Sequence, residues 1–348
     1  MSAPATGGAL DARQALARWM SGGSLSHGET EDLFGQLMDG AVPDTLKSAL
    51  LVALAMKGES EEEIAGAASA MRRRVVAIPH SRPEVVDTCG TGGDGKGGFN
   101  VSTAAAFVVA GAGAPVAKHG NRSVSSRSGS ADVLAALGVP LDVTPETAAR
   151  SIDEIGIAFL FAPRLHPAMA AVAPVRRELA VRTVFNLLGP LTNPAGARRQ
   201  VIGVYAEARV EPVARVLARL GCEHALVVHG SDGFDEITTT GPTLVTEVRG
   251  GEVRSYQLEP LELGVARARP EELAGGDAED NARRLLALLE GEPGPLADMV
   301  AVNAGAALYV AGLAASLAEG LALARATLAC GAARAKLQAL RTFRGGPA

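Results

Sequence analysis

The chain has 348 residues, of which 47% are hydrophobic and 20% charged, and its formal net charge is −5. This is enough apolar material for one large core or two ordinary ones, and the mildly acidic balance gives no general electrostatic reason to bind nucleic acid. Three widely separated cysteines without CxxC spacing indicate a reducing compartment without a disulfide framework. We expect neither a signal peptide nor a membrane-spanning segment, and therefore a cytoplasmic protein.

The segment from about 10 to 80 is predicted to be helical throughout. Leucines recur there at helical spacing, as at Leu33, Leu37 and Leu54. Ser24 and Ser60 each precede carboxylates in the following turn and are therefore predicted to be N-caps.

Beyond Pro83 short apolar runs alternate with amphipathic stretches, which predicts a mostly parallel sheet covered by helices. Strands are expected at 85–89, 115–118, 157–161, 200–205 and 225–228, and helices near 102–111, 130–137, 145–155 and 210–220. Gly250–Gly251 between two β-type runs predicts an appended antiparallel hairpin. Helices are expected again from 277 to 340. Between the sheet regions, 167–188 is predicted to form one long helix, closed by Pro190 and Pro194, that packs on the N-terminal helices.

A glycine-rich loop at 90–98, called the glycine loop below, follows the first predicted strand and leads into the start of a predicted helix. Glycines let backbone N–H groups approach a ligand, and the helix N-terminus adds donors and a positive dipole end, so the loop is predicted to hold an anion. A dinucleotide fingerprint is matched by letter, but no acid lies between Gly95 and Asp132 to bind a ribose. A nucleoside-triphosphate P-loop needs Ser or Thr where Gly97 stands.

Two further segments carry charge at predicted strand ends. The loop 118–130 has three cations and five serines before a helix and suits a second phosphate-bearing group. Asp235 and Glu236 follow the strand at 225–228 and are typical magnesium ligands where phosphates share the ion. His166 and Arg176 are ten residues apart, so on one continuous helix they would lie on the same side.

In order along the chain, these segments resemble the anthranilate phosphoribosyltransferase family. The motifs that carry the resemblance are MKGE at 56–59, GTGGD at 90–94, FNVSTAAAFVVAG at 99–111, KHGNRSVSSRSGSADVLAALG at 118–138, HPAMAAVAPVRREL at 166–179, FNLLGPLTNP at 185–194, DE at 235–236 and NAGAALYVAG at 303–312. The resemblance spans nearly the whole chain. One departure is Gly98, where the family usually carries a small hydroxyl residue that helps to bind phosphate.

The resemblance implies a small helical domain and a larger α/β domain, joined by a hinge, in a homodimer formed through the small domains. The small domain is expected at 1–82, completed by about 168–194, and the large domain at 83–167 and 195–348. The implied reaction transfers the phosphoribosyl group of phosphoribosyl pyrophosphate to the amine of anthranilate and releases pyrophosphate, as a step of tryptophan biosynthesis. No general base is expected, because an aromatic amine is neutral at pH 7.

The resemblance also assigns residues to each ligand. The sugar diphosphate is assigned Gly90, Gly93, Asp94, Gly98, Asn100, Val101, Ser102, Thr103, Lys118, His119, Gly120, Asn121, Arg122, Ser123, Val124, Ser125, Ser126 and Ser130. Anthranilate is assigned Gly90, His119, Asn121, His166 and Arg176, with Arg176 facing its carboxylate. Two magnesium ions are assigned Ser102, Asp235 and Glu236.

Two alternatives remain open at this point. A pyrimidine nucleoside phosphorylase resembles this family in fold but uses phosphate as the nucleophile and lacks the acidic pair. A non-enzymatic relative that binds nucleic acid needs a basic groove, and the sequence pI of about 5.8 counts against it.

Overall fold

The structure is a computed structural model that describes residues 10–123 and 127–345. The chain forms two compact units, Met1–Val75 with His166–Thr192, and Val76–Leu165 with Asn193–Ala348. The sequence-based bounds at 82 and at 168–194 differ from these by a few residues. The segment after Val75 belongs to the second unit because the amide of Val76 bonds the carbonyl of Leu165 at 2.8 Å and the amide of Ile78 bonds that of Pro194 at 3.0 Å.

In its described residues the first unit contains helices and no strand, as the leucine spacing predicts. Its elements are α1 (Ala12–Met20), α2 (His27–Met38), α3 (Asp44–Lys57), α4 (Glu61–Arg72), η1 (Pro167–Ala171), α9 (Ala173–Leu179) and α10 (Phe185–Leu191). The N-cap at Ser60 is confirmed, because its side chain accepts from the amide of Glu63 and the Glu63 carboxylate accepts from the amide of Ser60. Ser24 is not a cap. Ser26 is the N-cap of α2, in a capping box with Glu29.

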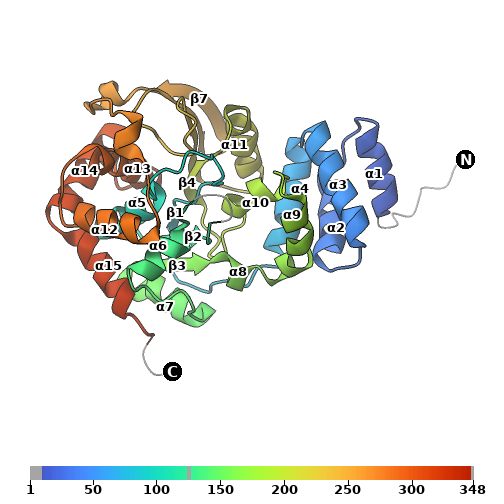
Figure 1. The fold of residues 1–348 in the computed structure, drawn as a ribbon, viewed down its shortest axis with the longest axis horizontal. Coiled ribbons are helices and arrows are strands. Elements are labelled where there is room, and N and C mark those ends of the chain that lie inside the picture. Colours follow the sequence, from blue (N-terminus) through green and yellow to red (C-terminus); the bar gives the residue numbers. More distant parts are fainter. Residues whose placement is uncertain (1–9, 124–126, 346–348) are drawn as a thin grey trace, which may run out of the picture. The chain divides into compact units, whose positions relative to one another are not determined.

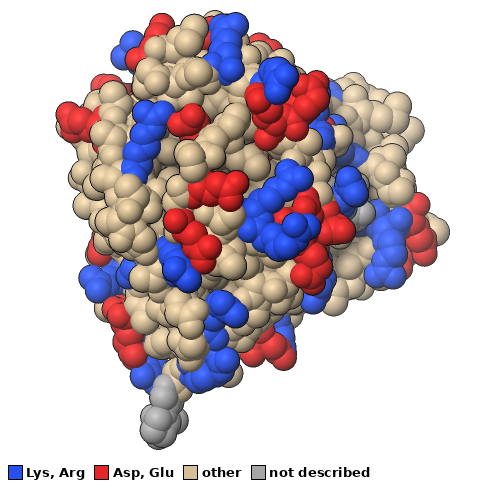
Figure 2. Space-filling model, turned by 60° about the vertical axis from the view of Figure 1, so that its left-hand side comes forward, with Lys and Arg blue, Asp and Glu red and all other residues tan. Residues whose placement is uncertain are grey.

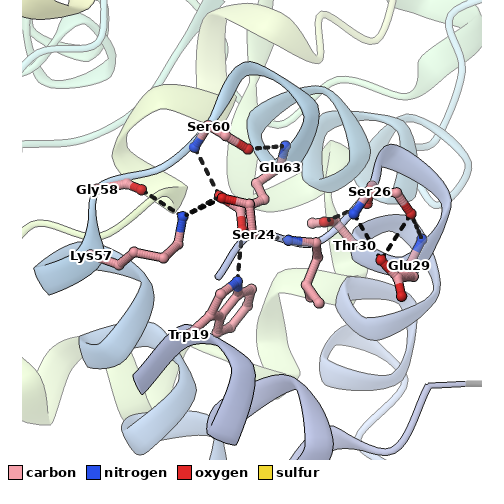
Figure 3. A network of polar contacts seen from close by, with 10 residues as sticks. Trp19, Ser24, Ser26, Glu29, Thr30, Lys57, Gly58, Ser60 and Glu63 are labelled. Carbon is pink, nitrogen blue, oxygen red and sulfur yellow. Dashed lines mark hydrogen bonds and ion pairs between the residues drawn. The ribbon is translucent and has the colours of Figure 1, made fainter. Parts of the chain in front are cut away.

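A buried carboxylate ties three of these helices together. Glu63 is fully buried, and its two oxygens accept from Trp19 Nε1 at 2.7 Å, the Leu25 amide at 3.0 Å, the Ser60 amide at 2.8 Å and Lys57 Nζ at 2.8 Å. Figure 3 shows Trp19 and Lys57 pointing at this carboxylate from different helices. Burial raises the pKa of Glu63, but these four donors outweigh it and hold the pKa below its ordinary value.

The prediction of one long helix over 167–188 is wrong. The segment is broken at Val172, just before Pro174, and again at Ala180, which has a φ of +50°. Proline has no amide to continue a helical ladder, and a left-handed residue ends one. Pro190 lies inside α10 and does not close it. His166 and Arg176 therefore do not share one helix.

The second unit is built on the mostly parallel sheet that the sequence predicts, with strand order β3-β2-β1-β4-β5-β6-β7. The strands are β1 (Val86–Asp87), β2 (Val116–Gly120), β3 (Ile157–Phe161), β4 (Arg199–Gly203), β5 (His224–Gly230), β6 (Thr243–Arg249) and β7 (Glu252–Leu258). β1 to β5 are parallel, and β6 and β7 form the predicted antiparallel hairpin around Gly250–Gly251.

Helices cover both faces of this sheet (Figure 1). On one face α5 and α13 pack against the strands, with α12, α14 and α15 behind them, and on the other α7 packs on β3 and α11 on β5 and β6. The helical elements are α5 (Val101–Gly111), α6 (Ser130–Ala136), α7 (Pro145–Ile155), α8 (Ala162–Leu165), η2 (Glu207–Arg209), α11 (Val210–Arg219), η3 (Pro260–Leu263), η4 (Pro270–Leu273), α12 (Ala278–Leu289), α13 (Pro295–Ala311), α14 (Leu317–Ala329) and α15 (Ala332–Thr342).

Strand order determines where a ligand can bind. The chain runs from β1 outward to β2 and β3, then returns to place β4 on the other side of β1. In open α/β sheets the crevice beyond the carboxyl ends of two such strands is the usual binding position. The loops after β1 and β4 meet at this point, because the Thr91 amide bonds the Gly203 carbonyl at 2.8 Å and the Tyr205 amide bonds Thr91 Oγ1 at 3.1 Å.

Candidate functional site

The glycine loop and the acidic pair are in direct contact. Asp235 Oδ2 accepts from the Gly92 amide at 2.7 Å, and Glu236 Oε1 accepts from the Ser102 amide at the start of α5 at 3.1 Å. The acids are more than 130 residues from their partners along the chain, so the sheet brings them together. The loop itself turns sharply, with positive φ at Gly92, Gly93, Gly95 and Gly97.

Close packing at two glycines holds the acidic pair in place. A Cβ atom on Gly203, the last residue of β4, would lie 1.5 Å from the carbonyl oxygen of Asp235. A Cβ on Gly90 would lie 3.0 Å from Asp235 Oδ2. The backbone of Asp235 therefore lies directly on the end of β4, and the carboxylate lies against the start of the glycine loop.

The two carboxylates offer oxygen ligands in a buried place where their negative charge is disfavoured. Burial raises the pKa of Asp235, and Asp94 raises it further; burial and then Asp235 raise the pKa of Glu236. Lys118 opposes both shifts. Neighbouring carboxylates whose charged forms are disfavoured fit a divalent cation, and an all-oxygen set suits magnesium or calcium.

A second group of potential ligands lies nearby. One ligand atom from each of Asp87, Cys89 and His119 falls within 4.8 Å of the others. Both oxygens of Asp87 are already engaged, accepting from the His119 amide at 3.1 Å and from Asn193 Nδ2 at 2.7 Å. Burial and Asp87 raise the pKa of the Cys89 thiol to about 12, and the thiolate, not the thiol, binds metals. The acidic pair is therefore the better cation site.

The β2 residues assigned to the sugar diphosphate are buried under the loops. Lys118 is 4% exposed and His119 3%, and Gly120 is buried as well. Lys118 Nζ donates to the His119 carbonyl at 3.2 Å and the Thr88 carbonyl at 3.4 Å. The positive charge of Lys118 also lowers the pKa of Asp235 and of Glu236, so Lys118 partly offsets the effect of their burial.

The loop after β2 meets the start of α6. Asp132 accepts from the amides of Ser123 and Gly129 at 3.1 and 3.0 Å and from Arg122 Nη1 at 2.9 Å. Burial raises the pKa of Asp132, but these donors lower it on balance. The Ser130 hydroxyl bonds the backbone of Asn121 at 3.2 Å. Val124, Ser125 and Ser126, also assigned to the sugar diphosphate, lie outside the described residues.

Residues at the start of α5 differ in how they face the site. Asn100 is the N-cap, but its side chain makes no capping bond and instead accepts from Asn281 Nδ2 at 2.9 Å and donates to the Ser128 carbonyl at 3.4 Å. Val101 and Thr103 are 2% and 1% exposed, so they offer a ligand little surface. Asn100 thus links the glycine loop both to the loop before α6 and to α12.

His166 and Arg176 belong to the helical unit. Burial lowers the pKa of His166 to about 4, so its imidazole is neutral at pH 7. Arg176 is partly buried, with its guanidinium carbon 5.4 Å from the ring centroid of Phe185, whereas Arg177 is exposed. Within the part of the chain that the structure describes, no carboxylate pairs with Arg176.

Three residues important to this arrangement carried no assignment from the sequence. Asp87 and Asn193 brace the end of β1, and Asn281 holds Asn100. A carboxylate inside an apolar strand could have marked Asp87, because Asp is almost never fully buried without partners. No local pattern gives Asn193 or Asn281 this role, although Asn193 lies in the motif at 185–194, since their partners are 106 and 181 residues away.

Comparison with known proteins matches both units to one family. The model described as "Glycosyl transferase family, a/b domain" matches residues 82–334, and the "helical bundle domain" of the same family matches 13–75. The anthranilate phosphoribosyltransferase of Rubrobacter xylanophilus is 56% identical over 328 residues, covering 94% of this chain and 95% of that protein. The one from Laribacter hongkongensis is 55% identical over 326 residues, covering 93% and 95%. The chain belongs to the anthranilate phosphoribosyltransferase family.

Solved structures of this family have the same fold. The anthranilate phosphoribosyltransferase of Thermus thermophilus superimposes with a TM-score of 0.90 at 50% identity, covering 94% of this chain and 98% of that one. The Saccharomyces cerevisiae enzyme in complex with PRPP and Mg superimposes with a TM-score of 0.85 at 28% identity, covering 94% and 96%. The helical unit and the mostly parallel sheet are therefore the fold of the family.

Proposed function

We propose that this chain transfers the 5-phosphoribosyl group of phosphoribosyl pyrophosphate to the amine of anthranilate, giving N-(5-phosphoribosyl)anthranilate and pyrophosphate, in tryptophan biosynthesis. The observation that carries the proposal is the direct contact of Asp235 and Glu236 with the glycine loop and the α5 N-terminus. The family relationship supports it: relatives at 55% and 56% identity bear this name.

In the proposed donor site, N–H groups of the glycine loop and the α5 N-terminus bind phosphate oxygens. Gly90, Gly93, Asp94, Gly98, Asn100 and Ser102 line this side, and Asn121, Arg122, Ser123 and Ser130 line the other. We assign Lys118, which is buried and lowers the pKa of both acids, to charge balance in place of direct phosphate contact. For the donor, Val101, Thr103, His119 and Gly120 are proposed to shape the site from within their helix and strand.

We propose that two Mg²⁺ ions are held by Asp235, Glu236 and Ser102. The structure of a yeast relative has been solved in complex with PRPP and Mg. When bound, magnesium neutralises charge on the departing pyrophosphate. The residues of the chain orient the donor so that the C1–oxygen bond breaks as the amine nitrogen bonds C1, through an oxocarbenium-like state. The amine proton then leaves to solvent, and no side chain is required as a base.

For the acceptor we propose that Arg176 pairs with the carboxylate of anthranilate, which the absence of a carboxylate partner among the described residues supports. His166, neutral at pH 7, contributes an uncharged ring. Gly90, His119 and Asn121 are the proposed acceptor contacts of the α/β unit. The yeast relative has been solved with 4-fluoroanthranilate.

Two further properties belong to the proposal. We propose a homodimer, as the family resemblance implies, and a cytoplasmic location, which the three free cysteines support. None of the helices in the described ranges has the length and apolar character that a bilayer crossing requires.

The deciding experiment follows the loss of anthranilate fluorescence when phosphoribosyl pyrophosphate and Mg²⁺ are added. The variant Asp235→Asn/Glu236→Gln should lower turnover at least ~10²-fold and alter the magnesium dependence, because it removes the charge that holds the cation. The control Glu207→Gln/Glu252→Gln removes two exposed carboxylates and should behave as wild type. A wild-type magnesium profile for the first variant contradicts the metal assignment.

The same preparation tests the alternatives. Release of free base from a pyrimidine nucleoside and phosphate would indicate a phosphorylase. Nucleic-acid binding would appear as a salt-dependent shift of DNA. Against the latter, the face in Figure 2 has basic and acidic side chains intermixed and no groove of one sign.

A further inference from the structure

The acidic loop, residues 231–236, follows β5, and its four consecutive residues 233–236 contact the glycine loop and the α5 N-terminus. Two contacts are the hydrogen bonds of Asp235 and Glu236 described above. The other two are packing contacts: a Cβ on Gly233 would lie 2.6 Å from Lys96 Cε, and a Cβ on Gly98 would lie 2.4 Å from Phe234 Cε1. The acidic loop therefore supports the glycine loop along its length.

Glycine is required at position 98 by packing against Phe234 and not by the backbone conformation. It is not among the glycines with positive φ. The three atoms nearest to its Cβ position all belong to the Phe234 ring, at 2.4, 3.2 and 3.4 Å. Such distances are too short for a real side chain, so residue 98 can be larger than glycine only if residue 234 moves or is smaller.

The backbone at Gly98 is also fixed from the other side. It forms an isolated antiparallel bridge with Ala274, in which the bonds run from the Gly275 amide to the Gly97 carbonyl at 2.9 Å and from the Phe99 amide to the Leu273 carbonyl at 3.3 Å. These bonds use the amides of Phe99 and Gly275, which leaves the Gly98 N–H outside the bridge. Gly98 thus lies between a bridge and an aromatic ring.

Phe234 has little freedom to retreat. Its side chain is 8% exposed, its amide donates to Asp232 Oδ1 at 3.1 Å, and its carbonyl accepts from the Gly230 amide at 2.9 Å. Asp232 in turn accepts from Thr240 Oγ1 at 2.6 Å. The backbone of Phe234 is therefore held in a hydrogen-bonded turn, and a side chain at residue 98 must displace the glycine loop or distort this turn.

We propose that Phe234 is a positioning residue for the sugar diphosphate. Its ring sets the position of the Gly98 backbone, and it makes glycine obligatory at 98. The proposal rests on the proposed function for the identity of the ligand. Phe234 itself has no assigned ligand contact, and it acts through the loop.

Four proteins test it: wild type, Gly98→Ser, Phe234→Leu and the double variant. The dissociation constant for phosphoribosyl pyrophosphate with Mg²⁺ is measured by calorimetry, and the KM values for donor and anthranilate are measured alongside. Gly98→Ser should weaken donor binding ~10-fold or more and raise the donor KM with little change in the anthranilate KM. In the double variant leucine leaves room for serine. Its donor dissociation constant should lie within ~3-fold of the wild-type value, because the effects of substitutions at two residues in contact are not additive.

Phe34→Leu is the matched control, since Phe34 is fully buried in α2 of the helical unit. It should lower the melting temperature without changing the donor dissociation constant. Wild-type donor binding by Gly98→Ser, or a double variant as weak as Gly98→Ser alone, would overturn the proposal. If wild type binds the donor but transfers nothing to anthranilate, the proposed function fails while the binding data still decide the role of Phe234.

Discussion

Replacing Gly203 by alanine tests whether the position of the acidic pair matters for activity. A Cβ at residue 203 would lie 1.5 Å from the Asp235 oxygen and 2.2 Å from its carbonyl carbon, where ordinary contacts begin at 3.4 Å. Gly203 has no positive φ, so alanine is compatible with the backbone, and the three atoms nearest to its Cβ position all belong to Asp235. The Asp235 peptide must therefore move by about 2 Å, or β4 must yield, a strain of about 1–3 kcal/mol.

That movement is larger than the Asp235–Gly92 hydrogen bond of 2.7 Å can tolerate, and Glu236 is the next residue. A displacement of about 1 Å at a reacting centre can cost ~10²-fold, so kcat/KM should fall by at least ~10²-fold. The fluorescence assay measures this loss, and thermal unfolding checks that the variant is folded. A folded Gly203→Ala protein with wild-type kcat/KM would refute the reasoning.

The control is Gly28→Ala, a glycine in α2 with no atom within 4 Å of its Cβ position. It has no positive φ either, so its stability should be unchanged or raised by about 0.4–1 kcal/mol. Its kcat/KM should equal that of wild type.

Further predictions concern the helical unit. Arg176→Ala should raise the KM for anthranilate far more than that for the donor in steady-state assays, and equal effects would remove Arg176 from the acceptor site. Glu63→Gln should lower the free energy of unfolding by about 3 kcal/mol in urea titrations, because it leaves the buried Lys57 ammonium without its counter-charge. The pKa of Glu63 in the folded protein lies below its ordinary value of 4.5. The stabilisation by its carboxylate is therefore present above pH 4.5 and is lost as the pH falls through the folded pKa. The unfolding free energy of Glu63→Gln should depend less on acid pH than that of wild type.

Local patterns predicted most elements because they depend on neighbours in the chain. The strand at 157–161 and the helix at 145–155 have the predicted bounds, and Gly250–Gly251 forms the hairpin turn. The first strand was expected at 85–89 but spans only Val86–Asp87. The His119 amide bonds the Asp87 side chain in place of a β1 carbonyl, so the ladder ends there. The hydrophobic periodicity of the sequence cannot predict that a side chain replaces a backbone carbonyl as the acceptor.

The sequence by itself determined the chemical groups of the site: a glycine loop before a helix, a basic loop before another, and adjacent acids at a strand end. Each is a property of a few consecutive residues. Only the tertiary structure decided that Gly203 must be glycine to admit Asp235, that the Phe234 ring lies against Gly98, and that the charge of Lys118 acts on both acids. These depend on contacts between segments that are far apart in the chain, and such contacts exist only after the sheet has fixed the order of its strands.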